Sequence, residues 1–111
     1  DGAGEIVAFL VAVAVVTPIV EELFFRGLVF RSLLKRGVPS LRAGVITTVV
    51  FVLPHLGSAG DWTSLASLAG SITVLGFAFQ IACHVTNNRL GAPIVAHMVI
   101  NGTAAIVLAF G

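Results

Sequence analysis

Four long apolar segments dominate the sequence, and they limit its possible folds more than any other feature. We place them at about residues 5–36, 41–56, 64–86 and 92–110. Runs of this length are too long for β-strands, and they suit helices that cross a bilayer. Only 10% of the residues are charged, against about 25% in soluble domains. The sequence therefore predicts an all-α fold, a multispanning transmembrane helical bundle.

The first segment is the longest, and a proline interrupts it. Because proline removes one helical hydrogen bond, we expect this helix to be kinked near Pro18. The Gly37–Pro39 turn should end it, and Ser40 is suited to be the N-cap of the next helix. No repeat divides the chain. We therefore treat residues 1–111 as a single transmembrane domain, and expect it to be a fragment of a larger membrane protein.

Basic residues gather at the first and third connections between the expected helices, and acidic residues at the opposite ends. The basic residues are Arg31, Lys35, Arg36, Arg42 and Arg89, and the acidic ones are Asp1, Glu5 and Asp61. The positive-inside rule predicts that the first and third connections are cytoplasmic, in what we expect to be a bacterial cell membrane. No basic patch interleaved with aromatic residues suggests a nucleic-acid partner.

Three charged residues, Glu21, Glu22 and Arg26, lie in the middle of the first apolar segment, where an unpaired charge is costly. Glu22 and Arg26 are four residues apart, so their side chains can meet on one face of a helix. Glu21 is rotated by about 100° from its neighbour and cannot share that arginine equally. The spacing predicts that Glu22 is neutralised by Arg26 and that Glu21 is available for chemistry.

Further polar residues occur in the second and fourth apolar segments. His55 ends the second segment, and His97 and Asn101 lie on one face of the fourth. Counted at about 1.5 Å per helical residue, these side chains and Glu21 can lie in one buried layer. A glutamate beside a histidine can activate a water molecule, while a second histidine and an amide can donate hydrogen bonds to an oxyanion.

These residues form three motifs, in order and on successive apolar segments. The motifs are Glu21-Glu22-x-x-x-Arg26, Phe51-x-x-x-His55 and His97-x-x-x-Asn101. This pattern resembles the CPBP family of CAAX proteases and bacteriocin-processing enzymes, also called the Abi or type II CAAX prenyl endopeptidase family. The resemblance covers almost the whole chain, from Glu5 to about Ala105. It implies a multispanning membrane protein with an intramembrane glutamate-type peptidase site.

The resemblance also implies roles for individual residues. Glu21 and His55 would activate the water, and His97 and Asn101 would stabilise the oxyanion of a tetrahedral intermediate. The paired Glu22 and its arginine would support the helix or the substrate. The expected substrate is a peptide or protein, possibly membrane-associated, and the lipid bilayer is the other expected partner. No cofactor is expected.

Two alternative functions remain open from the sequence. Glu21, His55 and His97 could instead bind zinc, because catalytic zinc sites with two histidines and one glutamate exist. The helical His-Glu-x-x-His motif that would favour such a site is absent from the sequence. The chain could also be a non-catalytic membrane module, acting in immunity or assembly, whose polar layer fixes the register of its helices.

Overall fold

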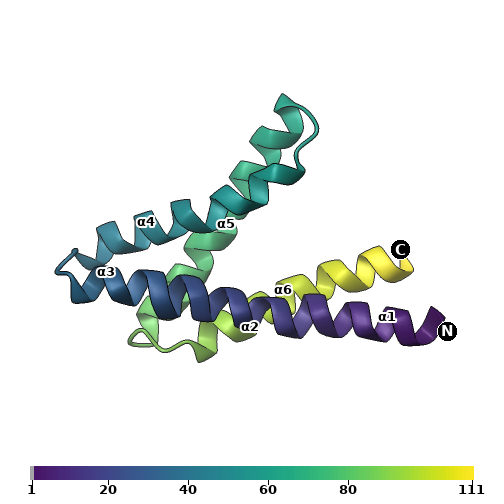
Figure 1. The fold of residues 1–111 in the computed structure, drawn as a ribbon, viewed down its shortest axis with the longest axis horizontal. Helices are drawn as coiled ribbons and strands as arrows, with labels where there is room; N and C mark the ends of the chain where they lie inside the picture. Colours follow the sequence, from purple (N-terminus) through teal and green to yellow (C-terminus); the bar gives the residue numbers. More distant parts are fainter. Residues whose placement is uncertain (1) are drawn as a thin grey trace.

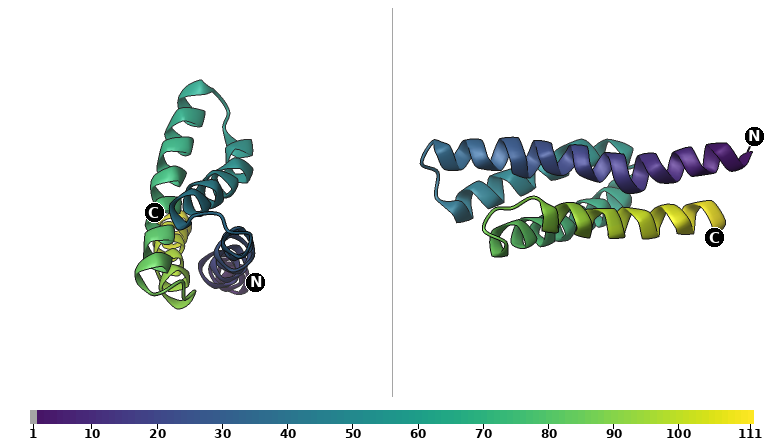
Figure 2. Two further views of the ribbon diagram at one scale, coloured as in Figure 1. Left: turned by 90° about the vertical axis from the view of Figure 1, so that its left-hand side faces the viewer. Right: turned by 90° about the horizontal axis from the view of Figure 1, so that it is seen from below.

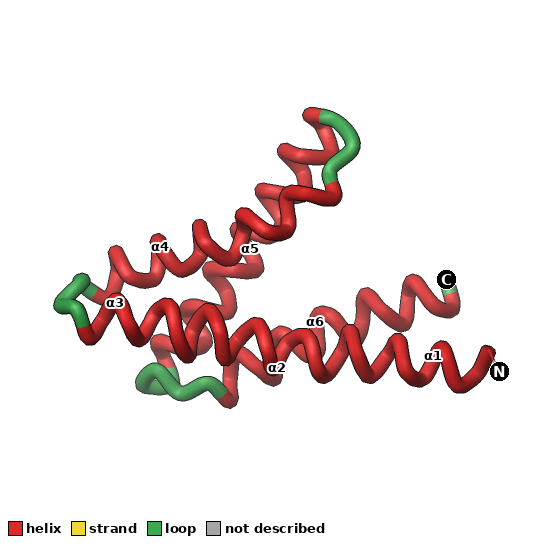
Figure 3. The backbone as a smooth tube through the Cα atoms, in the orientation of Figure 1, coloured by secondary structure: helices red, strands yellow, loops and turns green. Residues whose placement is uncertain are grey.

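The computed structural model describes residues 2–111, and it confirms the predicted helical fold. Within those residues the secondary structure is helical, with no strand, and four helices are long and apolar enough to cross a membrane. They span Gly2–Lys35, Ser40–Ser58, Trp62–Val85 and Gly91–Phe110, within three residues of the predicted bounds. Short turns connect them (Figure 3). The expected position of Asp1 lies outside the described residues.

The first helix is continuous, but its hydrogen bonding switches from α-helical to π-helical in two segments. It consists of α1 (Gly2–Val11), η1 (Ala12–Val16), α2 (Thr17–Glu22), η2 (Leu23–Phe30) and α3 (Arg31–Lys35). Segments η1 and η2 are π-helical. The kink expected near Pro18 stays a prediction; the structure has a widened π-helical turn just before the proline, in a helix that does not break. Such segments are rare and occur often at functional sites, and here both flank the two glutamates.

The second and third helices form a hairpin that projects from the rest of the molecule (Figure 1). The second consists of α4 (Ser40–Val52) and a 3₁₀ segment, η3 (Leu53–Ser58), and the third is α5 (Trp62–Val85). Ser40 is not the N-cap predicted from the sequence. Pro39 occupies that position without a side-chain bond, so Ser40 lies inside the first turn.

A side-chain cap is instead present on α5. The Asp61 carboxylate accepts hydrogen bonds from the backbone N–H of Ser64 at 2.7 Å and from its hydroxyl at 2.9 Å. Both bonds hold the pKa of Asp61 below its ordinary value, and the bond from the backbone N–H has the larger effect. The carboxylate is therefore stabilised in its charged form at the first turn of α5, where unpaired N–H groups favour an anion.

Helix α6 (Gly91–Phe110) lies beside the N-terminal half of the first helix, against η1 and α2 (Figure 2). Helix α4 packs against η2, and α5 contacts both α4 and α6. The molecule measures 51 × 33 × 18 Å, and its short dimension is less than two helix diameters of about 10–12 Å. The bundle is therefore open and thin, and its contacts converge where α2 and η2 meet α4, α5 and α6.

The α3–α4 and α5–α6 connections lie at the same end of the molecule, which we call the basic end. There the Arg31 side chain donates a hydrogen bond to the Asn88 carbonyl at 2.8 Å. Asn87 and Asn88 adopt left-handed backbone conformations in this turn, which asparagine tolerates better than most residues. The arrangement agrees with the four-span topology. That the basic end faces the cytoplasm stays a prediction from charge.

Candidate active site

The predicted pairing of Glu22 with Arg26 is present and completely buried. Arg26 Nη1 donates to Glu22 Oε1 at 3.1 Å, and neither side chain is accessible to solvent. Arg26 Nη2 donates a second bond, at 2.7 Å, to the carbonyl of Gly76 on α5. The guanidinium also lies over the Phe51 ring, 4.8 Å from its centroid. The arginine thus ties η2 to both α4 and α5, as a buried ion needs several partners to offset its desolvation.

Glu21 occupies a different environment from its neighbour. Its side chain is 24% exposed, and its two oxygens face two histidines from other helices. Oε1 lies 3.9 Å from His55 Nε2, and Oε2 lies 3.5 Å from His97 Nε2. The three predicted site residues Glu21, His55 and His97 therefore come together although they are up to 76 positions apart in the chain.

His55 is oriented by the backbone of the residue one turn before it. Its Nδ1 lies 2.7 Å from the Phe51 carbonyl. Because a carbonyl only accepts, this bond places a proton on Nδ1, and the neutral ring then has a free lone pair on Nε2. The 3.9 Å separation between Nε2 and Glu21 is too long for a direct hydrogen bond and suits a bridging water.

His97 connects the two glutamates. Its Nδ1 lies 2.8 Å from Glu22 Oε1, which accepts the proton of that nitrogen, while Nε2 faces Glu21. The ring stacks on Phe79, with centroids 4.4 Å apart and an interplanar angle of 18°. The Glu22 bond fixes which nitrogen faces Glu21, as supporting carboxylates do for functional histidines in metal sites. With the proton on Nδ1, both Nε2 and the Glu21 carboxylate are acceptors. A second proton, on either Nε2 or Glu21, would allow a hydrogen bond between them.

Asn101 points to the backbone of the first helix. Its Nδ2 donates to the Val13 carbonyl at 3.3 Å. In the π-helical register that carbonyl would bond the N–H of residue 18, which is proline, while the Thr17 N–H is already bonded to the Ala12 carbonyl. Asn101 therefore supplies the donor that Pro18 lacks. The second N–H of its amide remains available for another acceptor.

A groove opens beside the Glu21–His55 pair. Its volume is about 430 Å³, and it is lined by Val20, Glu21, Phe24, Phe25, Pro54 and His55. Four of these residues are apolar, and the two polar ones are the half-buried Glu21 and His55. The groove can therefore hold an apolar segment of a ligand against a carboxylate and an imidazole.

The sequence did not identify the contribution of α5. Gly76 belongs to none of the three motifs, but its carbonyl accepts a hydrogen bond from Arg26. Phe79 carried no prediction, yet it stacks on His97. No motif spacing could have found these residues, because backbone carbonyls and stacked rings are chosen by how helices cross. Phe51, the aromatic residue of the second motif, positions His55 through its carbonyl and packs among these rings.

Residues Glu21, His55 and His97 would form the metal site in the zinc alternative. Among residues 2–111, no three His, Cys, Asp or Glu side chains are arranged in a way that could hold a metal ion. Glu21 meets the two histidines through different oxygens, Oε1 toward His55 and Oε2 toward His97.

Comparisons with known proteins agree with the motif pattern. A family model described as "type II CAAX prenyl endopeptidase Rce1-like" matches residues 3–103. The "membrane-embedded CAAX protease MroQ" of Staphylococcus aureus (strain USA300) is 29% identical over 109 residues, which cover 94% of this chain. The chain corresponds to only 40% of the length of that relative. No solved structure matches the chain.

Proposed function

The chain belongs to the Rce1-like type II CAAX prenyl endopeptidase family, and we propose that it carries the active site of an intramembrane endopeptidase. The observation that supports this most directly is the meeting of Glu21, His55 and His97 from three different spans. The four apolar spans and the membrane-embedded relative make the chain part of an integral membrane protein. The proposed substrate is a peptide or protein that reaches the site within or beside the bilayer.

In the proposed mechanism, Glu21 and His55 activate a water held between them. The 3.9 Å gap between Glu21 Oε1 and His55 Nε2 fits a water that donates one proton to each acceptor. Glu21 or His55 takes a proton as the water oxygen attacks the scissile carbonyl, and the same group then protonates the leaving amine. The Phe51 carbonyl keeps the acceptor nitrogen of His55 turned toward the water.

His97 and Asn101 are the proposed donors to the oxyanion of the tetrahedral intermediate. His97 can donate from Nε2 when both ring nitrogens carry protons. Asn101 can donate with the N–H that does not bond to Val13. Donors held in place before the reaction stabilise the developing charge without reorganising.

Glu22 and Arg26 have a supporting role in this proposal. They are fully buried, so they do not touch a substrate in the groove. Glu22 orients His97, and Arg26 fixes Glu22 relative to α5. The pair therefore holds the imidazole in the position that the oxyanion requires.

The test uses the full-length protein in membranes, since the chain spans 40% of the length of the relative that it matches. Peptides released from membranes that contain the parent protein are compared with those from membranes containing Glu21→Gln or Glu5→Gln. Products should disappear in Glu21→Gln and persist in Glu5→Gln, a carboxylate at the far end of the first helix. Identical products with Glu21→Gln would leave a non-catalytic membrane module as the better explanation.

A further inference from the structure

Buried polar atoms without hydrogen-bond partners lie on α4, on α5 and on the part of the first helix that carries the Glu22–Arg26 pair, and we call them the polar line. They are Glu22 Oε2, Arg26 Nε, Thr47 Oγ1, Thr48 Oγ1 and Gln80 Oε1, and a further such atom, Asn88 Oδ1, lies in the α5–α6 turn. Burying a polar atom without a partner is costly, and such atoms in native proteins are often bound by ordered water. Their grouping on facing helices indicates a shared ligand.

Thr47 and Thr48 differ from three other hydroxyl-bearing residues of the chain. Thr86, Thr103 and Ser71 each donate to a carbonyl one turn earlier on their own helix, at 2.8 Å. Such back-bonding is the usual solution for a hydroxyl in an apolar helix. Thr47 and Thr48 do not use it, so their hydroxyls remain free to bind something in the interface.

Two glycines place Gln80 and Thr48 in adjacent layers. A Cβ on Gly44 of α4 would lie 3.2 Å from Gln80 Cγ, and one on Gly76 of α5 would lie 3.0 Å from Thr48 Cγ2. Gln80 therefore faces α4 one turn away from the level at which Thr48 faces α5. The Gly76 carbonyl accepts from Arg26, so the layer of Thr48 adjoins the Glu22–Arg26 pair.

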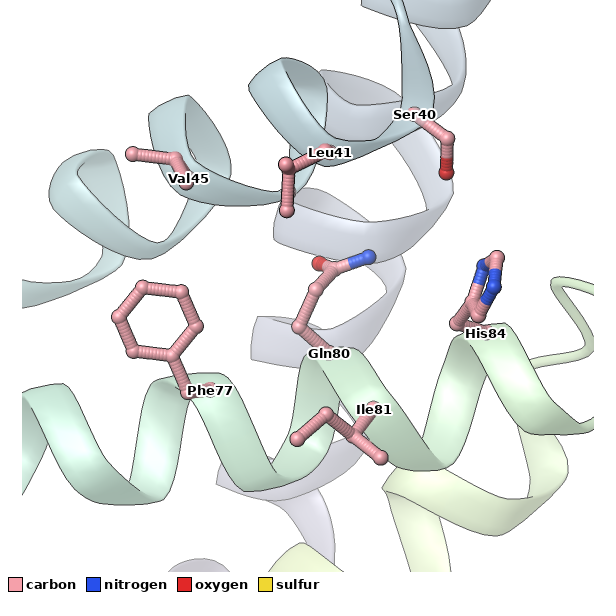
Figure 4. Close-up of a pocket in the computed structure, with 8 residues that line it drawn as sticks. Ser40, Leu41, Val45, Phe77, Gln80, Ile81 and His84 are labelled. Carbon is pink, nitrogen blue, oxygen red and sulfur yellow. The ribbon is translucent and has the colours of Figure 1, made fainter.

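The line ends at a cavity near the basic end. This cavity, of about 390 Å³, lies between α4 and α5, with Gln80 in its wall and Ser40 and His84 toward the helix ends. Figure 4 shows the Gln80 amide reaching from α5 toward α4, between Leu41 and Phe77 on the one side and His84 on the other. The Gln80 side chain is 7% exposed, so it separates the cavity from the buried layers.

The chemistry of the line matches water. It combines an acceptor on Glu22, a donor on Arg26 and two hydroxyls that do both, which a small molecule with donors and acceptors can satisfy. A water about 2.8 Å from each of two groups also bridges a separation of about one helical turn, 5.4 Å. An acyl chain could fill the outer cavity, but it could not satisfy the buried atoms.

We propose that the α4–α5 interface is a water inlet, with waters bound by Gln80 and Thr48 between the cavity and the Glu22–Arg26 pair. It connects the buried pair, and through it His97, to the aqueous phase at the basic end. Its use rests on the proposed peptidase function: the inlet keeps protons exchanging with His97 while a peptide fills the separate groove beside Glu21. Substrate and water would then reach the site from different sides.

The test is hydroxyl-radical labelling by pulsed X-ray radiolysis of the full-length protein in nanodiscs, which oxidises buried side chains next to bound water. The reporter is Phe51, which is 2% exposed and lies against Gly76, and the dry reference is Phe30, which is 0% exposed. We expect Phe51 to be labelled severalfold faster than Phe30. We expect that excess to vanish in Thr48→Val/Gln80→Leu.

Matched variants keep this test falsifiable. Thr48→Ser retains the hydroxyl and should retain the labelling, and Thr103→Val makes the same change as Thr48→Val at an exposed, back-bonded position. If the double variant does not fold, Thr48→Val alone, which is nearly isosteric, gives the same comparison. Equal labelling of Phe51 and Phe30 in the parent, or excess labelling that survives loss of the polar groups, would overturn the inlet.

The labelling is measured without substrate, so its outcome is separate from that of the proposed function. A protein that cleaves peptides but shows a dry Phe51 would retain the peptidase proposal and lose the inlet. A protein with fast Phe51 labelling and no peptide cleavage would do the reverse.

Discussion

Two adjacent glutamates occupy opposite environments in this structure. Glu22 faces inward, where Arg26, His97 and the layers of α4 and α5 enclose it. Glu21 faces the groove, with 24% of its side chain exposed and two histidines near its oxygens. Because consecutive residues differ by about 100° around a helix, one dipeptide can supply both the support and the reactive face of a site.

The difference teaches how a thin, open bundle can keep charge in an apolar setting. The enclosed carboxylate is bound by an arginine and a histidine, and the arginine is bound in turn by a backbone carbonyl. The exposed carboxylate has no hydrogen bond of that quality and only two longer contacts with imidazoles. The first arrangement restricts motion, and the second leaves an acceptor ready for a proton.

The largest expected effect is on activity when the exposed carboxylate is changed. On the proposed mechanism, Glu21→Gln should lower turnover of the full-length protein by about 10²–10⁴-fold, the range for loss of a general base. Its thermal unfolding should stay close to that of the parent, since Glu21 makes no close buried bond. Steady-state kinetics and thermal melting in the same detergent measure both quantities. A large loss of stability would show that Glu21 supports the fold as Glu22 does, and would contradict the difference between the two glutamates.

The next effect concerns stability on the enclosed side. Glu22→Gln should destabilise the protein by about 3–5 kcal/mol, because it leaves the buried Arg26 charge without its partner. Unfolding in denaturant, followed by circular dichroism, measures the change. The double variant Glu22→Gln/Arg26→Met should recover part of the loss. Full stability of the single variant would mean that another group already neutralises Arg26.

A smaller effect is expected for Asn101, which binds the first helix at Val13. Asn101→Leu removes the amide that bonds Val13 and the proposed oxyanion donor. Loss of one oxyanion donor typically lowers kcat by about 10²–10³-fold. Loss of a structural bond alone would instead lower the melting temperature with kcat retained in the folded fraction. Measuring kcat and KM at several temperatures below the melting point separates these two roles.

Asp61 is the N-cap of α5, in the loop that joins the two helices of the projecting hairpin (Figure 1). Its pKa is below the ordinary 3.8 because Ser64 donates to it. The stability it contributes is therefore present above the unfolded pKa and is lost as the pH falls through the lower, folded pKa. The parent should exceed Asp61→Asn in melting temperature at neutral pH, and this difference should vanish at acidic pH. A constant difference would contradict the role of the charge.

The smallest expected effect is that of metal removal. The ligands of the zinc alternative are not arranged as a metal site among residues 2–111, so activity should be unchanged by dialysis against a strong chelator. Elemental analysis of the active full-length protein provides the second measurement. Activity lost on chelation and restored by zinc would instead show that Glu21 and the histidines regroup around a metal.

The sequence alone determined the four helices and the first division of charge. Apolar length fixed the spans because a bilayer requires helices of about 20 residues, and the i,i+4 spacing fixed the Glu22–Arg26 pair because helix geometry is local. It also placed Glu21, His55 and His97 in one layer, since depth follows from counting residues along a helix.

Tertiary structure decided what no spacing encodes. The crossing of the helices selected the Gly76 carbonyl as a partner of Arg26 and Phe79 as the stacking partner of His97. It also turned the side-chain amide of Asn101 toward the Val13 carbonyl, to which Pro18 cannot donate. It left the hydroxyls of Thr47 and Thr48 without hydrogen-bond partners. These contacts depend on rotation and tilt between separate helices, which are set by the packing of many side chains at once.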